Sequence, residues 1–253
     1  MRGRLYLAEF VGTAVLLLVG LSIVIFMFGD GSPAAAWIPN IKLRQFVTGG
    51  LFGSTGAAIA VSWVGRESGA HINPAVTLAF WMARKIDTRT AMGYVAAQLA
   101  GGLAGSIPLL AWGAMGRSVT FGATIPGAGY SVFDAFLGEA ITTFALVVLL
   151  CVFLAFRHLR RFTPAMIPIL YAIMIPLEAD ISGTSTNPAR SFGPAVVSGE
   201  WSSWWIYWAG PIAGAVAAML VASLLARRIE VAKLYHFDSD RDRIFRRMAK
   251  SAS

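Results

Sequence analysis

Two copies of the tripeptide Asn-Pro-Ala constrain the fold of this chain more than any other feature. They lie 114 residues apart and consist of Asn73, Pro74 and Ala75, and of Asn187, Pro188 and Ala189. Asparagine caps the free N–H groups of a helix and proline fits its first turn, so each copy predicts a helix start. The expected helices are about 16 Å long, near half of a hydrocarbon core about 30 Å thick. Two half-spanning helices predict a pore lined by their N-terminal ends.

The rest of the chain has the composition of a polytopic membrane protein. It is 57% hydrophobic and 13% charged, which favours membrane helices over a water-soluble core. Apolar runs predict six spans, at about residues 5–28, 43–65, 90–113, 133–156, 164–177 and 204–226. The predicted fold class is an all-α membrane protein with six transmembrane helices and two re-entrant half-helices.

The net charge of +8 comes from an excess of Lys and Arg on the segments expected in the cytoplasm, and it does not indicate a nucleic-acid site. With both termini in the cytoplasm, 17 basic residues fall on inner segments and three on outer ones, with Arg190 left over. We therefore expect an integral protein of the plasma (inner) membrane, with both termini cytoplasmic and no nucleic-acid partner. The first span follows Arg2 and Arg4 as a signal peptide would, but its length and Glu9 within it predict that it is retained.

The two halves of the chain repeat each other, over about residues 1–115 and 130–226. Residues 8–13 resemble 138–143, and residues 100–105 resemble 209–214. Three spans per half is an odd number, so the second half enters the membrane inverted. Glycine pairs at 49 and 53, 101 and 105, and 210 and 214 predict close helix packing. We expect one channel domain over residues 1–226 and a basic cytoplasmic tail over 227–253, either on anionic lipid or in solvent.

These features together resemble the aquaporin or major intrinsic protein family. The resemblance rests on the paired motifs, on His71 before the first, on Arg190 after the second, and on the acids Glu9 and Glu139, and it covers about residues 4–228. It implies a homotetramer with a pore in each subunit. That pore would conduct water and small uncharged solutes passively and exclude protons and ions.

The two asparagines explain how such a pore would exclude charge. If Asn73 and Asn187 cap their helices through the side-chain oxygen, each amide NH2 is left to donate to a passing water. Two helix N-termini, each worth about half a positive charge, also raise the energy of any cation between them.

The resemblance also implies a selectivity filter, which reads Gly53, Ile175, Thr184 and Arg190. An arginine at membrane depth costs about 2.5–3.5 kcal/mol unless it lines water or finds partners, and an ion pair with Glu178 or Asp180 is the alternative. Water-selective members typically carry a bulky aromatic at the Gly53 position and a histidine at the Ile175 position. The sequence therefore predicts an unusually wide filter, unless the adjacent Phe52 faces the pore instead.

Secondary markers favour a water channel, since Ser191, Ala195, Tyr207 and Trp208 match that type. A facilitator of glycerol, urea or metalloid acid, with water secondary, is the alternative for the solute. Glu9 and Glu139 are expected to accept hydrogen bonds from the re-entrant loops, and His71 to pack there. A proton relay through the acids would instead make an ion-coupled secondary transporter. Separately, a pH gate is the alternative role for His71.

Nothing in the sequence indicates catalysis. It holds no phosphate-binding glycine loop, metal-ligand cluster or nucleophile with a base, so we expect no enzyme, no cofactor and no metal. The single cysteine, Cys151, lies within a span and is expected to pack in the core. A membrane junction protein with a closed pore is the remaining rival to a channel.

Overall fold

The computed structural model describes residues 2–235 and 237, and this part of the chain is helical, with no strand. Six long helices form the body: α1 (Arg2–Phe28), α3 (Ile41–Val61), α6 (Thr88–Ser106), α8 (Val132–Ala155), α9 (Thr163–Glu178) and α11 (Ile206–Val221). Two short helices begin at the repeated prolines, α5 (Pro74–Met82) and α10 (Pro188–Ser198). The predicted architecture of six spans and two half-helices is confirmed.

Smaller elements connect the long helices. They are α2 (Ala34–Trp37), α4 (Trp63–Glu67), α7 (Gly113–Ser118), α12 (Ser223–Ala226), and 3₁₀ turns at Ile107–Trp112, Thr120–Gly122 and Arg160–Phe162. The second span ends at Val61, earlier than expected, because Ser62 caps α4 by accepting a hydrogen bond from the Val64 amide. Within the described residues, only α1, residues 88–118 and α8 are long and apolar enough to qualify as spans by themselves.

Capping residues fix where three of the long helices begin. The side chain of Asn40 accepts from the Leu43 amide at the start of α3, and Asp87 accepts from Thr90 at the start of α6. Ser131 and Asp134 form a reciprocal capping box at the start of α8. The sequence therefore encodes these boundaries locally.

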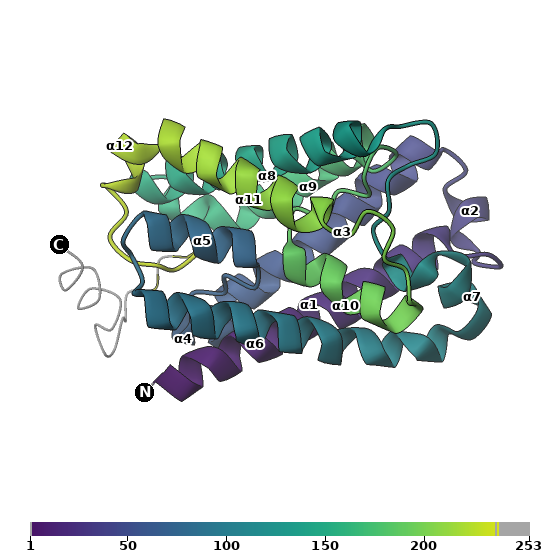
Figure 1. Cartoon of the computed structure of the whole chain (residues 1–253), viewed down its shortest axis with the longest axis horizontal. Coiled ribbons are helices and arrows are strands. Elements are labelled where there is room, and N and C mark those ends of the chain that lie inside the picture. The colour runs from purple at the N-terminus through teal and green to yellow at the C-terminus, as the bar shows by residue number, and fades with distance from the viewer. Residues whose placement is uncertain (1, 236, 238–253) are drawn as a thin grey trace.

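The helices pack as an inverted repeat. The α1–α6 pair in the first half matches the α8–α11 pair in the second, and α3 packs along α9 between the halves. Each half-helix packs on a helix of the other half, α5 on α11 and α10 on α6. Figure 1 shows α5 in the left half of the molecule and α10 in the right half, with their ends meeting near the middle.

The predicted glycine seams are confirmed. A side chain at Gly105 would overlap the Ala14 carbonyl of α1, and one at Gly214 would overlap the Ala140 carbonyl of α8. At Gly53, an added Cβ would lie 2.6 Å from the Pro168 Cα of α9. Each long helix pair is therefore in backbone contact. Elsewhere in the core, Cys151 is buried with its thiol 3.9 Å from the Met219 sulfur.

The packed structure continues beyond residue 226, where the sequence predicted a solvated or lipid-bound tail. Ile229, Ala232 and Leu234 are buried against the body, and the Leu234 amide donates to the Gly69 carbonyl at 3.0 Å. Gly69 has a φ of 92°, and a side chain there would overlap the Ala232 carbonyl, so glycine is needed for this approach. The rest of the predicted tail, residues 238–253, lies outside the described residues.

Candidate functional site: two re-entrant loops and a central channel

The loops that lead into α5 and α10 share the pattern Ser-Gly-x-x-x-Asn-Pro-Ala, from Ser68 and from Ser182. Both asparagines are extended and cap their helices, Asn73 accepting from the Ala75 amide and Asn187 from the Ala189 amide. The residues just before them, Ile72 and Thr186, have positive φ angles of 42° and 54°. Such a conformation is strained in β-branched residues, so both loops must be held in place by their surroundings.

Glu9 holds the first loop. Its carboxylate, fully buried on α1, accepts from the backbone amides of His71 at 3.0 Å and Ile72 at 2.6 Å. It also accepts from the Ser68 hydroxyl at 2.5 Å and from the Gln98 amide at 2.7 Å. Four donors therefore converge on one carboxylate, which compensates for its burial.

Glu139 takes the same position in the second half. It accepts from the amides of Ser185 and Thr186, each at 2.7 Å, and from the Ser182 hydroxyl at 2.6 Å. Two loop-holding tyrosines complete the symmetry, because Tyr94 donates to the Ser68 carbonyl at 2.7 Å and Tyr207 to the Ser182 carbonyl at 2.9 Å. Sequence reasoning missed the two serines and Tyr94, although aligning the two Ser-Gly-x-x-x-Asn patterns would have indicated the serines.

The two asparagines also tie the halves together. Asn73 donates from Nδ2 to the Thr186 carbonyl at 2.8 Å, and Asn187 donates to the Ile72 carbonyl at 2.9 Å. The expectation from sequence was an amide NH2 free to face the lumen. A primary amide carries two hydrogens. Each asparagine donates one of them to the opposite loop, and the other can be donated to a ligand.

His71 is buried beside the first loop in a fixed orientation. Its ring stacks on Phe80 with centroids 4.5 Å apart, and its two nitrogens lie 3.2 Å from the Thr77 hydroxyl and from the Ala232 carbonyl. The carbonyl can only accept, so Nε2 carries the hydrogen, and Nδ1 accepts from Thr77. His71 thus joins the first loop to the segment that follows α12.

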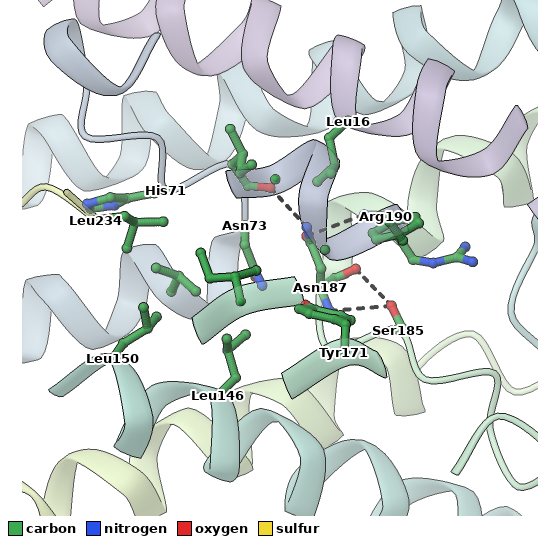
Figure 2. A pocket seen from close by; sticks show the side chains of 16 residues that line it. Leu16, His71, Asn73, Leu146, Leu150, Tyr171, Ser185, Asn187, Arg190 and Leu234 are labelled. Carbon is green, nitrogen blue, oxygen red and sulfur yellow. Dashed lines mark hydrogen bonds between the residues drawn. The ribbon is translucent and has the colours of Figure 1, made fainter. Parts of the chain in front are cut away.

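Two cavities run through the middle of the molecule. The tail-side cavity is lined by both asparagines and extends from His71 and Leu234 to Arg190. Figure 2 shows this cavity with His71 and Leu234 at one end and Arg190 at the other. The far-side cavity is lined by residues that include Gln45, Ile175 and Thr184. Phe52, Tyr171 and Arg190 line both cavities, so the two meet at these side chains.

Arg190 is buried at this junction and is held by a backbone carbonyl. Its Nη1 donates to Gly122 O at 2.6 Å, and among the described residues no carboxylate lies within ion-pair distance of it. The ion pair considered from sequence is absent there, since Asp180 instead pairs with Lys42 at 2.8 Å and Glu178 forms no salt bridge within the described residues. Gly122 has a φ of 78°, and a side chain added there would meet Leu21 at 3.1 Å. Most donors of Arg190 stay available to a ligand.

Of the four predicted filter positions, Ile175, Thr184 and Arg190 line the far-side cavity together, but Gly53 does not. Phe52 takes its place, with the Arg190 guanidinium 6.0 Å from the centre of its ring. Gly53 faces the backbone of α9 and borders only the tail-side cavity. The close α3–α9 contact fixes the rotation of α3 and turns Phe52 inward. These linings favour Phe52 over Gly53 at this position, which is the alternative that the sequence left open, and the wide filter stays a prediction.

Comparisons with known proteins agree with this architecture. The major intrinsic protein family model matches residues 2–222. Aquaporin-6 of Mus musculus is 37% identical over 220 residues, covering 86% of this chain and 70% of the relative. Aquaporin AqpM of Methanothermobacter marburgensis is 33% identical, covering 87% and 96%. An aquaglyceroporin structure from Plasmodium falciparum matches with a TM-score of 0.70 at 20% identity, covering 89% of this chain and 99% of that one.

Proposed function

The chain belongs to the major intrinsic protein family of passive channels for water and small solutes, and we propose that its filter consists of Phe52, Ile175, Thr184 and Arg190. On this proposal the chain is mainly a water channel that also passes small uncharged solutes. The observation that carries it is the junction of the two cavities at Phe52, Tyr171 and Arg190. A molecule crossing the protein must pass this point.

The residues around the junction account for the choice of neutral solutes. Arg190 places a full positive charge there, and the N-terminal ends of α5 and α10 add partial positive charge beside Asn73 and Asn187. A cation would lose hydration without gaining a counter-charge, whereas a neutral molecule loses only hydrogen bonds. The one free hydrogen on each asparagine amide would orient a passing water and interrupt proton hopping.

The filter composition supports some solute flux beside water. Phe52 narrows the junction. Ile175 offers no hydrogen bond opposite Arg190, so the apolar side of a solute can contact the Ile175 side chain without losing a hydrogen bond. A facilitator of glycerol, urea or metalloid acid, with water secondary, is the second candidate. The apolar Ile175 is the observation that favours it.

We further propose a homotetramer in the plasma membrane with the N terminus on the cytoplasmic side. The distribution of basic residues supports this orientation. In Figure 1, α1 begins at the same end of the molecule as α12, so the tail-side cavity would open toward the cytoplasm. Cysteine-accessibility labelling at each end in sealed vesicles would test the orientation, and detergent-corrected mass measurement would test the tetramer.

Stopped-flow light scattering on proteoliposomes tests the function. The expected result is faster water flux than in empty liposomes, slower but measurable flux of glycerol or urea, and no dependence on proton or sodium gradients. Gradient-dependent solute flux would favour an ion-coupled transporter instead. Water flux equal to that of empty liposomes would favour a closed-pore junction protein and contradict the proposal.

A further inference from the structure

Tyr171 occupies a position in the channel that the filter prediction did not include. It lies on α9 one helical turn before Ile175, is one of the three residues that line both cavities, and packs its ring against Phe52 with centroids 6.1 Å apart. Figure 2 shows its side chain beside Asn187 and Ser185. Phe52 and Tyr171 thus form an aromatic wall at the junction.

The hydrogen bonds around Tyr171 fix which way its hydroxyl points. The phenolic oxygen lies 2.7 Å from the Thr186 hydroxyl. Thr186 uses its own hydrogen to donate to the Ser185 carbonyl, also at 2.7 Å. Because that hydrogen is committed, the phenol must donate to Thr186. The Tyr171 oxygen then accepts no hydrogen bond among the described residues, and the side chain lines both cavities.

Two other polar residues that line this part of the tail-side cavity, Arg190 and Asn187, present hydrogen-bond donors. Arg190 keeps donors beyond the one that bonds Gly122, and Asn187 keeps one amide hydrogen. Phe52 contributes no hydrogen-bonding group. A solute that carries hydroxyl or amide hydrogens would need an acceptor here, and the Tyr171 oxygen is placed to provide one.

We propose that Tyr171 determines solute specificity by accepting a hydrogen bond from small neutral solutes that both donate and accept, such as polyols and urea. Its orientation by Thr186 makes it complementary to the donors of Arg190 and Asn187. Water depends less on this acceptor, because each water in a single row of waters can also form hydrogen bonds with its neighbours. A polyol fills the junction and has no neighbouring water there to accept from its hydroxyl. A hydroxyl left without a hydrogen bond in the junction lowers the flux of the polyol.

This inference rests on the proposed function, and the Tyr171→Phe variant tests it while keeping the ring. Water, glycerol and urea fluxes would be measured by stopped flow on proteoliposomes with equal amounts of folded protein. We expect the glycerol-to-water and urea-to-water ratios to fall about threefold to tenfold, the effect of one lost hydrogen bond. Water flux itself should remain near that of the native protein.

Two variants distinguish acceptance of a solute from support of the loop. Thr186→Val keeps the β-branched shape and the phenol but breaks the bond that orients the phenol. The flux ratios should therefore fall less than in Tyr171→Phe, because the phenol oxygen remains available to accept. Tyr94→Phe removes another buried phenol bond, to the Ser68 carbonyl, at a residue that borders neither cavity. It should leave the ratios unchanged.

The outcomes separate this proposal from the function on which it rests. A native protein without water flux contradicts the proposed function. Native water flux with unchanged or raised ratios in Tyr171→Phe overturns only the role of Tyr171. Native water flux with no glycerol or urea flux at all overturns both the role of Tyr171 and the proposed passage of small solutes, but leaves the water channel. Equal losses in Tyr171→Phe and Thr186→Val would show that the bond merely supports the loop and would also overturn it.

Discussion

The amide of Asn187 donates to the carbonyl of Ile72, 115 residues earlier in the chain, at 2.9 Å. Asn73 makes the matching bond to Thr186. These bonds require Ile72 and Thr186 to hold left-handed conformations, each of which costs about 1–3 kcal/mol. Glu9 and Glu139 bind the amides of these same residues, so the buried acids position the carbonyls on which the paired asparagines depend.

Replacing Glu9 with glutamine should therefore loosen the first loop. The amide NH2 of glutamine cannot accept from the backbone N–H groups that the carboxylate binds, and each buried donor left unpaired costs about 1–3 kcal/mol. We expect a lower midpoint of thermal unfolding and reduced water flux, measured by fluorescence-detected chromatography after heating and by stopped flow. Glu200→Gln, on an exposed acid that accepts from Ser202, is the matched control. Equal behaviour of both variants would contradict this role.

Arg190→Ala should admit cations. It removes the buried charge at the junction and frees the Gly122 carbonyl, which then offers a cation an oxygen ligand. The measurement is potassium conductance in planar bilayers or a fluorescent flux assay, with exposed Arg117→Ala as control. Water flux should persist in both variants. Conductance as low as that of the native protein would remove Arg190 from the filter.

Leu234 lines the tail-side end of the cavity. It lies against the cavity with His71, held by the bonds from Leu234 to Gly69 and from Lys233 to the Arg66 carbonyl. Leu234→Ala should raise water flux severalfold, because it removes an apolar obstruction at the mouth. Leu224→Ala, at a leucine 72% exposed on α12, should not. No increase in Leu234→Ala would show that the mouth opens elsewhere.

At the end of the molecule away from Leu234, the ion pair of Asp180 with Lys42 should make stability depend on pH. The hydrogen bond from Lys42, with help from Gln45, lowers the pKa of Asp180 below its ordinary value of 3.8. A lowered folded-state pKa stabilises the protein above the unfolded-state pKa, and that contribution is lost as the pH falls through the folded-state pKa. Acid unfolding below about pH 4 should therefore be less steep in Asp180→Asn. Because this pair is exposed, the difference should shrink in high salt; a salt-independent difference would contradict this assignment.

Much of this architecture could be predicted from sequence because it is encoded locally. The half-helices follow from Asn-Pro pairs, the spans from apolar runs, and the inverted halves from an odd number of spans. The seams at Gly105 and Gly214 follow from spacing alone, since only glycine allows such backbone contact.

The sequence left open the rotation of helices and the long-range contacts. Counting back from Asn73 reaches Gly53, but which of two adjacent residues faces the channel depends on how α3 packs on α9. There Gly53 meets Ile167 and Pro168, 114 and 115 residues later in the sequence. The burial of Leu234 likewise depends on the space that Gly69 leaves. Tyr171 was overlooked because its hydrogen bond to Thr186 joins two helical regions through a bent loop.

The assignment of Phe52 to the junction is tested most directly by the glycerol-to-water flux ratio of Phe52→Ala in proteoliposomes. We predict a rise of about tenfold, because the aromatic wall beside Arg190 is lost. Gly53→Ala should instead lower the yield of folded protein, since its Cβ would lie 2.6 Å from Pro168. An unchanged ratio in Phe52→Ala, with a changed ratio in well-folded Gly53→Ala, would contradict the account.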